Sequence, residues 1–151
     1  MSNDLRVPGP KAAIDVDESQ SLDPRPQFPF SRRHRLTHAN EFAAVFKARN
    51  SARGSRIIVH GLANGLAWSR LGLSVGRKFG NSVARSRFKR LCREAFRLSQ
   101  QDLPTGWDLV LTPVLPPKST PKGDDQWRTI TLQEIMTDLQ TKTHQLARRH
   151  R

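Results

Sequence analysis

Apolar residues recur three and four positions apart in three stretches of the chain, which is the spacing of amphipathic helices. The predicted helices cover roughly residues 38–48, residues 82–99 and the residues from 132 onward. Thr37 and Asn81 are the expected N-caps of the first two helices, because short polar side chains accept hydrogen bonds from the free N–H groups of a first turn. The third helix opens with the capping-box pattern of Thr131 and Glu134.

Three further stretches have the composition or the alternation of β-strands. They are residues 56–60, 70–78 and 107–112, and residues 49–55 leave room for one more short strand. In 70–78, leucine and valine at 71, 73 and 75 point one way, and glycine or serine at 72, 74 and 76 the other. The face of small residues lets another group approach closely. The order of elements, α-β-β-α-β-α, predicts an α+β fold in which a sheet packs with three helices.

The predicted elements lie in one small domain with an N-terminal tail. Residues 1–27 hold four prolines and scattered acidic residues but no periodic apolar face, which predicts a disordered tail. The domain is expected to span residues 28–148, with a stiff proline-rich loop at 113–125 inside it. With 151 residues, of which 36% are hydrophobic, the chain can bury one modest core.

Several classes of protein are disfavoured by what the sequence lacks. No apolar run approaches the roughly 18 residues of a membrane-spanning helix, and the N-terminus lacks the pattern of a secretory signal. The single cysteine, Cys92, excludes an internal disulfide framework and a cysteine-based zinc site. Cys92 falls on the apolar face of the second predicted helix, which indicates core packing and not a nucleophile. These features favour a soluble cytoplasmic protein.

The charge of the chain is unevenly distributed. The net formal charge is +13, and residues 31–100 hold 16 basic residues but only Glu41 and Glu94 as acids. Crowded like charges destabilise a compact domain, so this excess indicates a polyanionic partner, of which RNA or DNA is the common one. An acidic lipid surface is the weaker alternative, because a membrane-binding helix carries bulky apolar residues opposite its basic face.

The second predicted helix concentrates this charge. Arg90, Arg93 and Arg97 stand at i, i+3 and i+7 and therefore share one stripe, about 10 Å long, opposite the apolar positions. Guanidinium groups bind phosphates through paired hydrogen bonds, so the stripe predicts a nucleic-acid contact. The alternative is a solvated helix face, which is less favoured because Glu94 alone is available within the helix to offset the repulsion.

The residues around this helix resemble the signature of the bacterial ribonuclease P protein subunit. The similar residues are Gly80-Asn-Ser-Val-Ala-Arg-Ser-Arg-Phe-Lys-Arg-Leu-Cys-Arg-Glu-Ala-Phe-Arg97, preceded by Leu71-Gly-Leu-Ser-Val-Gly-Arg-Lys78. Arg35-Leu36, Phe42 and Val45-Phe46 also match, so the resemblance covers roughly residues 30–112. Ser86 stands where the family usually has asparagine, and its hydroxyl can still donate and accept a hydrogen bond.

The resemblance implies a function and a set of partners. Members of this family assist a catalytic RNA that removes the 5′ leader from precursor tRNA. The expected partners are therefore ribonuclease P RNA and precursor tRNA, with no membrane and no obligate protein partner. The enzyme is then expected to be a ribonucleoprotein endoribonuclease in which the RNA subunit performs catalysis. The Mg²⁺ that it uses is expected to be bound mainly by RNA, and the protein is expected to have no catalytic or metal-binding residues. The resemblance also implies a four-stranded sheet, three helices and a left-handed βαβ crossover, against the usual right-handed preference.

The resemblance further implies two sets of binding residues. Expected to contact the RNA subunit are Arg85, Arg87, Lys89, Arg90, Arg93 and Arg97. Expected to bind the 5′ leader are Phe42, Phe46, Ile58, His60, Lys78 and Asn81. Aromatic rings suit an unpaired leader because they stack on any base. From the spacing alone, core packing is the commoner reason for two phenylalanines four positions apart, and a histidine at a strand end is commonly a plain surface residue.

Two other hypotheses are less favoured. A structural RNA-binding protein of the ribosomal type shares the size, the charge and the lack of a catalytic constellation, but not this run of basic residues or the aromatic first helix. A double-stranded DNA binder needs a helix with side chains aimed at base edges and usually a dimer interface, and the sequence shows neither. The histidines, including His34 and His38, have no metal-ligand spacing.

Overall fold

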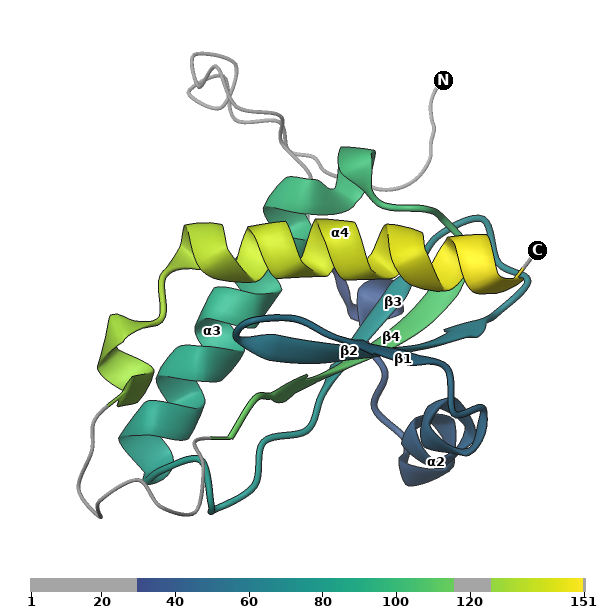
Figure 1. Cartoon of the computed structure of the whole chain (residues 1–151). Helices are drawn as coiled ribbons and strands as arrows, with labels where there is room; N and C mark the ends of the chain where they lie inside the picture. Colours follow the sequence, from purple (N-terminus) through teal and green to yellow (C-terminus); the bar gives the residue numbers. More distant parts are fainter. Residues whose placement is uncertain (1–29, 116–125, 151) are drawn as a thin grey trace, which may run out of the picture.

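A mixed four-stranded sheet forms the centre of the fold (Figure 1). The computed structural model describes residues 30–115 and 126–150, so the predicted tail over 1–27 and most of the predicted proline-rich loop lie outside the described residues. The strands are β1 (Ser51–Arg53), β2 (Ile57–Ala63), β3 (Arg70–Leu73) and β4 (Trp107–Pro113), in the spatial order β1-β2-β4-β3. β2 pairs antiparallel with β1 and β4, whereas β3 runs parallel to β4.

Helices cover both faces of the sheet. They are α2 (Ala39–Lys47), α3 (Ser82–Ser99) and α4 (Leu132–His150), with short 3₁₀ turns η1 (Arg32–His34), η2 (Gln100–Asp102) and η3 (Gln126–Thr129). α3 and α4 pack together on one face, and α2 lies on the opposite face (Figure 1). The predicted α+β class is confirmed. β3, α3 and β4 form a parallel βαβ unit, and its left hand stays a prediction from the resemblance.

Apart from shifts of one residue, element boundaries differ from the predictions at the end of β3, at the end of β2 and at the N-cap of α2. β3 ends at Leu73 instead of continuing to residue 78, because the chain turns at Gly76, whose carbonyl accepts the N–H of Phe79, before it enters α3. β2 continues three residues past 60, since β4 pairs with it as far as Ala63. The N-cap of α2 is His38 and not Thr37, because a glutamate of the first turn accepts the N–H groups of both residues.

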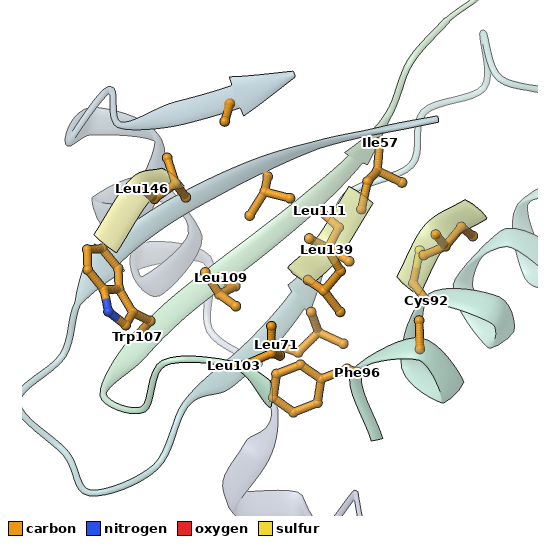
Figure 2. Packing of buried hydrophobic residues seen from close by; sticks show 14 of the residues in the cluster. Ile57, Leu71, Cys92, Phe96, Leu103, Trp107, Leu109, Leu111, Leu139 and Leu146 are labelled. Atoms are coloured by element: carbon orange, nitrogen blue, oxygen red, sulfur yellow. The ribbon is translucent and has the colours of Figure 1, made fainter. Parts of the chain in front are cut away.

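The hydrophobic core lies between the sheet and the α3–α4 layer (Figure 2). Alternate residues of the strands and one face of each helix supply it, as their periodicities require. Fully buried members are Ile57, Val59, Leu109, Leu111, Cys92, Ala95, Ile135, Leu139 and Leu146. The predicted core role of Cys92 is confirmed, and burial raises the pKa of its thiol far above the usual range. The thiol is therefore protonated and unreactive at neutral pH.

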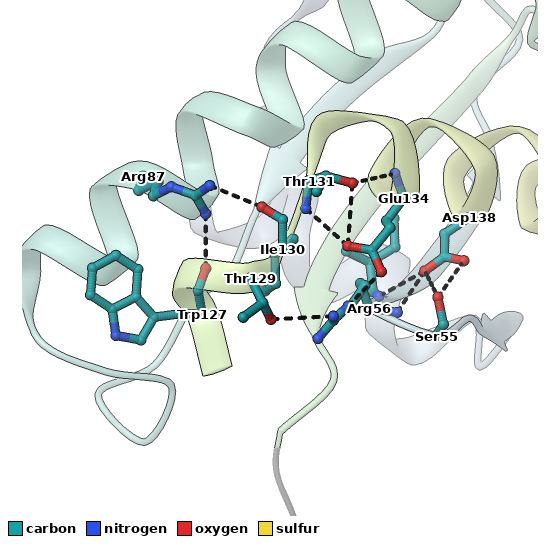
Figure 3. Close-up of polar contacts among 10 residues, drawn as sticks. Ser55, Arg56, Arg87, Trp127, Thr129, Ile130, Thr131, Glu134 and Asp138 are labelled. Atoms are coloured by element: carbon teal, nitrogen blue, oxygen red, sulfur yellow. Dashed lines mark hydrogen bonds and ion pairs between the residues drawn. The ribbon is translucent and has the colours of Figure 1, made fainter. Parts of the chain in front are cut away.

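A buried carboxylate ties the β1–β2 hairpin to α4 (Figure 3). Asp138 Oδ2 accepts hydrogen bonds from the backbone N–H groups of Arg56 and Ile57, at 2.6 and 3.2 Å. The Ser55 hydroxyl donates to the same carboxylate. Only glycine fits at position 54, because a Cβ atom there would lie 2.5 Å from Asp138 Cγ. These contacts hold in place the hairpin whose second strand faces α2.

Candidate RNA interface

α2 is fixed at its N-terminal end by an acidic residue that binds several groups. Glu41 Oε1 accepts hydrogen bonds from the N–H groups of Thr37 and His38, at 3.2 and 3.1 Å. Its Oε2 accepts one from Arg70 Nη1 at 3.0 Å, and Arg70 also donates to Asp108 at 2.8 and 2.7 Å. The hydrogen bond from the His38 N–H is the main cause that lowers the pKa of Glu41, and Arg70 adds to it. One arginine therefore attaches α2 to β3 and β4.

Gly72 allows α2 to lie directly against β3. A Cβ atom at this position would come within 2.8 Å of the Phe42 ring and 3.2 Å of Leu36 Cβ, which confirms the close approach predicted for this face of the strand. On α2, Val45 is fully buried and Phe42 is half-buried. Phe46, by contrast, is 39% exposed. Core packing therefore accounts for Val45 and in part for Phe42, but not for Phe46.

Phe46 and His60 meet at the open side of α2. Their rings are 4.9 Å apart in an edge-to-face arrangement, and the His60 Nε2 lies 3.2 Å from the Thr112 hydroxyl. Ile58 pairs with Thr112 in the neighbouring strand and is half-buried. Burial lowers the pKa of His60, so its ring is neutral at pH 7. We call Phe42, Phe46, Ile58, His60 and Thr112 the aromatic face; apolar and neutral rings of this kind can stack on nucleobases.

The other two predicted leader residues lie between β3 and α3. Lys78 is exposed in this segment. Asn81 is the N-cap of α3, as predicted, since its Oδ1 accepts the N–H of Ala84 at 2.9 Å. Asn81 therefore has a structural role, and its role toward the leader stays a prediction.

The basic residues of α3 are in different environments. The apolar side of the helix is buried, and Arg90 is exposed on the opposite side. Lys89 and Arg93 are half-buried toward η1 and β3. Arg97 binds Glu94 through two hydrogen bonds, at 2.9 and 2.5 Å, so the pairing expected within the helix is used here. The predicted stripe is present, and Arg90 and Arg93 are its members outside an ion pair with Glu94.

Arg87 and Arg85 flank this stripe. The Arg87 guanidinium donates to the backbone carbonyls of Trp127 and Ile130, at 2.8 and 2.9 Å, and so joins α3 to the segment that precedes α4 (Figure 3). Arg85 Nε is buried and has no hydrogen-bond partner among the described residues. An unsatisfied buried donor costs roughly 1–3 kcal/mol. The Arg87 guanidinium, by contrast, has its acceptors within the fold.

A cavity of about 180 Å³ connects the two predicted sets of residues. It lies where residues 35–37, α2, β3 and α3 meet. Phe42 from the aromatic face lines one side, and Lys89 and Arg93 from α3 line another. Phe30 and Arg35 also line the cavity, with the Arg35 guanidinium 5.0 Å from the centre of the Phe30 ring. The aromatic face and the basic helix therefore form one continuous surface.

Sequence patterns missed three residues of this surface. Phe30 and Arg35 precede α2 in irregular chain, where no periodicity assigns a direction to a side chain. Arg35 is placed by a bridge to Leu71, a contact 36 positions away in the sequence. Thr112 reaches His60 only because β4 pairs with β2 in this register. The alternation of β4 gives the face of Thr112 but not its partner.

Acidic residues contribute little to this surface. Of the carboxylates that the structure describes, Glu41, Asp108, Glu134 and Glu94 bind arginine side chains, and Asp138 binds backbone N–H groups. The remaining one, Asp102, is exposed in η2. In residues 30–115 and 126–150, no three His, Cys, Asp or Glu side chains are grouped as metal ligands. None of the helices in these ranges combines the length and the apolar character needed to cross a membrane.

A basic helix near a partly exposed aromatic face on a sheet is typical of proteins that bind single-stranded nucleic acid. The family model described as Ribonuclease P matches residues 30–127. A ribonuclease P protein component from Thermotoga petrophila is 42% identical over 84 residues, which are 56% of this chain and 72% of that protein. The chain therefore belongs to the ribonuclease P protein family.

Solved structures agree with this assignment. The RNase P protein from Thermotoga maritima is 30% identical, with a TM-score of 0.59, over 71% of this chain and 92% of that one. An RNase P protein from Staphylococcus aureus is 23% identical, with a TM-score of 0.58, over 76% of this chain and 94% of that one, and supports the fold alone. The predicted four-stranded sheet with three helices is the fold that these proteins share.

Proposed function

We propose that this chain is the protein subunit of ribonuclease P and assists an RNA subunit in removing the 5′ leader from precursor tRNA. The observation that carries the proposal is the continuity of the aromatic face with the basic helix through the cavity beside Phe42. In this proposal α3 binds the phosphates of the RNA subunit, and the aromatic face binds the unpaired leader. The protein then works in the cytoplasm, where both RNAs are made.

Each surface has the chemistry that its partner requires. Arg90 and Arg93 offer guanidinium groups, which bind phosphates regardless of sequence. Phe46 and His60 offer ring faces, which accept any base. Sequence-tolerant stacking suits leaders, because leaders differ from one precursor to another. A structural protein of the ribosomal type has no need for an exposed aromatic face next to its phosphate-binding helix.

Chemistry in this proposal is performed by the RNA subunit with Mg²⁺. The described residues do not fit a Mg²⁺ site of their own, because Mg²⁺ is held by grouped oxygen ligands. The carboxylates in this part of the chain stand apart, and all but Asp102 bind arginines or backbone N–H groups. We therefore assign no reaction step to a protein-bound metal. The protein contributes binding energy and orientation, and its cations offset part of the repulsion between two RNA molecules.

The leader assignment is tested by Phe46→Leu and His60→Ala, each reconstituted with the RNA subunit. Affinity is measured for precursor tRNA with a leader of one nucleotide and with a leader of about eight, a length within the range that single-strand sites cover. Loss of one stacked base predicts a roughly 5- to 150-fold weaker binding of the long leader, at about 1–3 kcal/mol per base. Binding of mature tRNA should not change.

Leu115→Ala is the matched control, because Leu115 is a similarly exposed apolar residue (42%) outside the aromatic face. Circular dichroism verifies that each variant is folded. Equal losses for both leader lengths, or no loss with either variant, would show that these rings do not bind the leader.

A further inference from the structure

The β1 edge of the sheet carries two arginines beside the aromatic face. Arg53 stands directly opposite Ile58 in the β1–β2 pair. Residues opposite each other in an antiparallel pair point to the same face, with Cβ atoms about 5 Å apart. Arg53 is exposed, so it extends the row of Ile58 and Thr112 by one strand. The other arginine, Arg49, follows α2 directly, three residues after Phe46.

Arg49 occupies a backbone conformation that disfavours it. Its φ angle is +53°, and it is the one non-glycine residue with a positive φ in the described ranges. Its N–H bonds to the carbonyl of Phe46 at 3.1 Å and so closes the end of α2. Glycine is the usual residue at this position after a helix, because it has no Cβ to strain. A strained residue at the rim of a binding surface points to a use for its side chain.

Neither arginine forms an ion pair with a carboxylate in residues 30–115 and 126–150. The ion pairs of the described residues join Arg56, Arg70 and Arg97 to their carboxylates, and none involves Arg49 or Arg53. The C-terminal end of α2 favours positive charge nearby, but that end offers no full counter-charge. Two unpaired cations at one edge of a face that carries stacking rings form an anion site of the kind that tracks a nucleic-acid backbone.

The order of the strands places this edge opposite the basic helix. α3 packs against β3, and the sheet then runs through β4 and β2 to β1. Three strand spacings of about 4.8 Å separate β3 from β1. An RNA strand that leaves α3 and crosses the aromatic face therefore reaches the β1 edge last. With the cleavage site on the α3 side of the sheet, as the proposal requires, the nucleotides that arrive at the β1 edge are those farthest from it.

We propose that Arg49 and Arg53 form a basic edge that binds phosphates of the distal part of the leader, beyond the nucleotides that stack on the aromatic face. The proposal rests on the leader-binding function proposed above. Its consequence is a length requirement: long leaders gain affinity from the basic edge, and very short leaders do not reach it.

The test uses Arg49→Gly and Arg53→Gln in the protein reconstituted with the RNA subunit. Arg49→Gly is chosen because glycine relieves the positive φ, so the variant should melt no lower than the parent protein and a loss of affinity is not a loss of folding. Arg148→Gln is the matched control, because Arg148 is an exposed arginine on α4, in the layer on the other face of the sheet (Figure 1). Dissociation constants are measured against salt for leaders of one and of about eight nucleotides.

Each variant should weaken binding of the long leader by roughly three- to tenfold at low salt. Each should also reduce the slope of log affinity against log salt by about 0.7, which is the value for one phosphate contact on a single strand. The one-nucleotide leader and the control variant should show the parent values.

Unchanged binding of the long leader by both variants, while Phe46→Leu still weakens it, overturns the basic edge and leaves the proposed function intact. Equal weakening for both leaders assigns these arginines to the tRNA body or the RNA subunit and also overturns the proposal. A parent complex that does not distinguish the two leaders refutes the proposed function itself.

Discussion

Gly72→Ala is expected to disturb the leader site without replacing any residue that is proposed to bind RNA. The new Cβ would lie 2.8 Å from two ring carbons of Phe42 and 3.2 Å from Leu36 Cβ. Atoms of neighbouring side chains do not approach this closely, so the ring must move or α2 must shift away from β3. Since Val45 on the same helix is fully buried, a shift of α2 also disturbs the packing beneath it.

The size of the effect follows from two opposed contributions. Overpacking of a buried site costs roughly 1–3 kcal/mol, whereas replacing glycine by alanine restricts the unfolded chain and returns about 0.4–1 kcal/mol. The net loss of stability is therefore between about 0 and 2.6 kcal/mol, and each kcal/mol lowers the melting temperature by about 2–4 °C for a chain of this size. If the displaced Phe42 ring also loses a stacked base, leader-dependent affinity falls roughly 5- to 150-fold.

Urea unfolding and leader-dependent binding are measured on Gly72→Ala and on Gly76→Ala. The second variant is the matched control, because a Cβ at Gly76 has nothing within 4 Å and its φ is not positive. Adding Phe42→Leu to Gly72→Ala removes the clashing ring atoms and should restore stability but not leader affinity. If Gly72→Ala is as stable as Gly76→Ala and binds the leader equally well, the Phe42 ring is not held against β3 as described.

Two further predictions concern stability. Arg87→Gln should lower the free energy of unfolding by about 1–3 kcal/mol, because two backbone carbonyls lose their donor. The matched variant Arg90→Gln should weaken RNA binding and leave the midpoint of urea unfolding unchanged. Equal midpoints for the two variants would contradict the structural role of Arg87. Burial lowers the pKa of both His34 and His60 from 6.5, so their neutral forms stabilise the fold above pH 6.5 and this contribution is lost as the pH falls toward 5. The loss of stability on acidification should be smaller in His60→Gln than in the parent protein. A parent melting temperature that stays constant from pH 7 to about 5 would refute this pH dependence.

Local signals predicted most of the fold. The cap at Asn81 and the capping box of Thr131 and Glu134 involve residues three positions apart, so the sequence displays both partners. The end of β3 depends instead on where the chain must turn to enter α3. The anchoring of the β1–β2 hairpin depends on Asp138, which lies 82 positions from Arg56. Pairings at that separation leave no periodic trace in a single sequence.

The sequence predicts which types of residue form the candidate site better than it predicts the role of each residue. The spacing of Arg87 on α3 suggests an outward arginine like Arg90, but its side chain reaches the carbonyls of a segment 40 positions away. Phe42 and Phe46 look equivalent at i and i+4, yet β3 covers the first and leaves the second exposed. Arg35 and Thr112 join the surface through pairings between distant segments. Roles that depend on such tertiary contacts require the structure.

The central claim is that the protein assists an RNA catalyst, and cleavage of precursor tRNA at low Mg²⁺ tests it most directly. The rate of leader removal is measured for a bacterial ribonuclease P RNA alone, for the purified protein alone, and for the two together, at a Mg²⁺ concentration where the RNA alone is slow. We predict that the protein restores cleavage by the RNA at the 5′ end of the mature tRNA and cleaves nothing by itself. Robust cleavage by the RNA-free protein, or an RNA rate that the protein does not raise, would contradict the account.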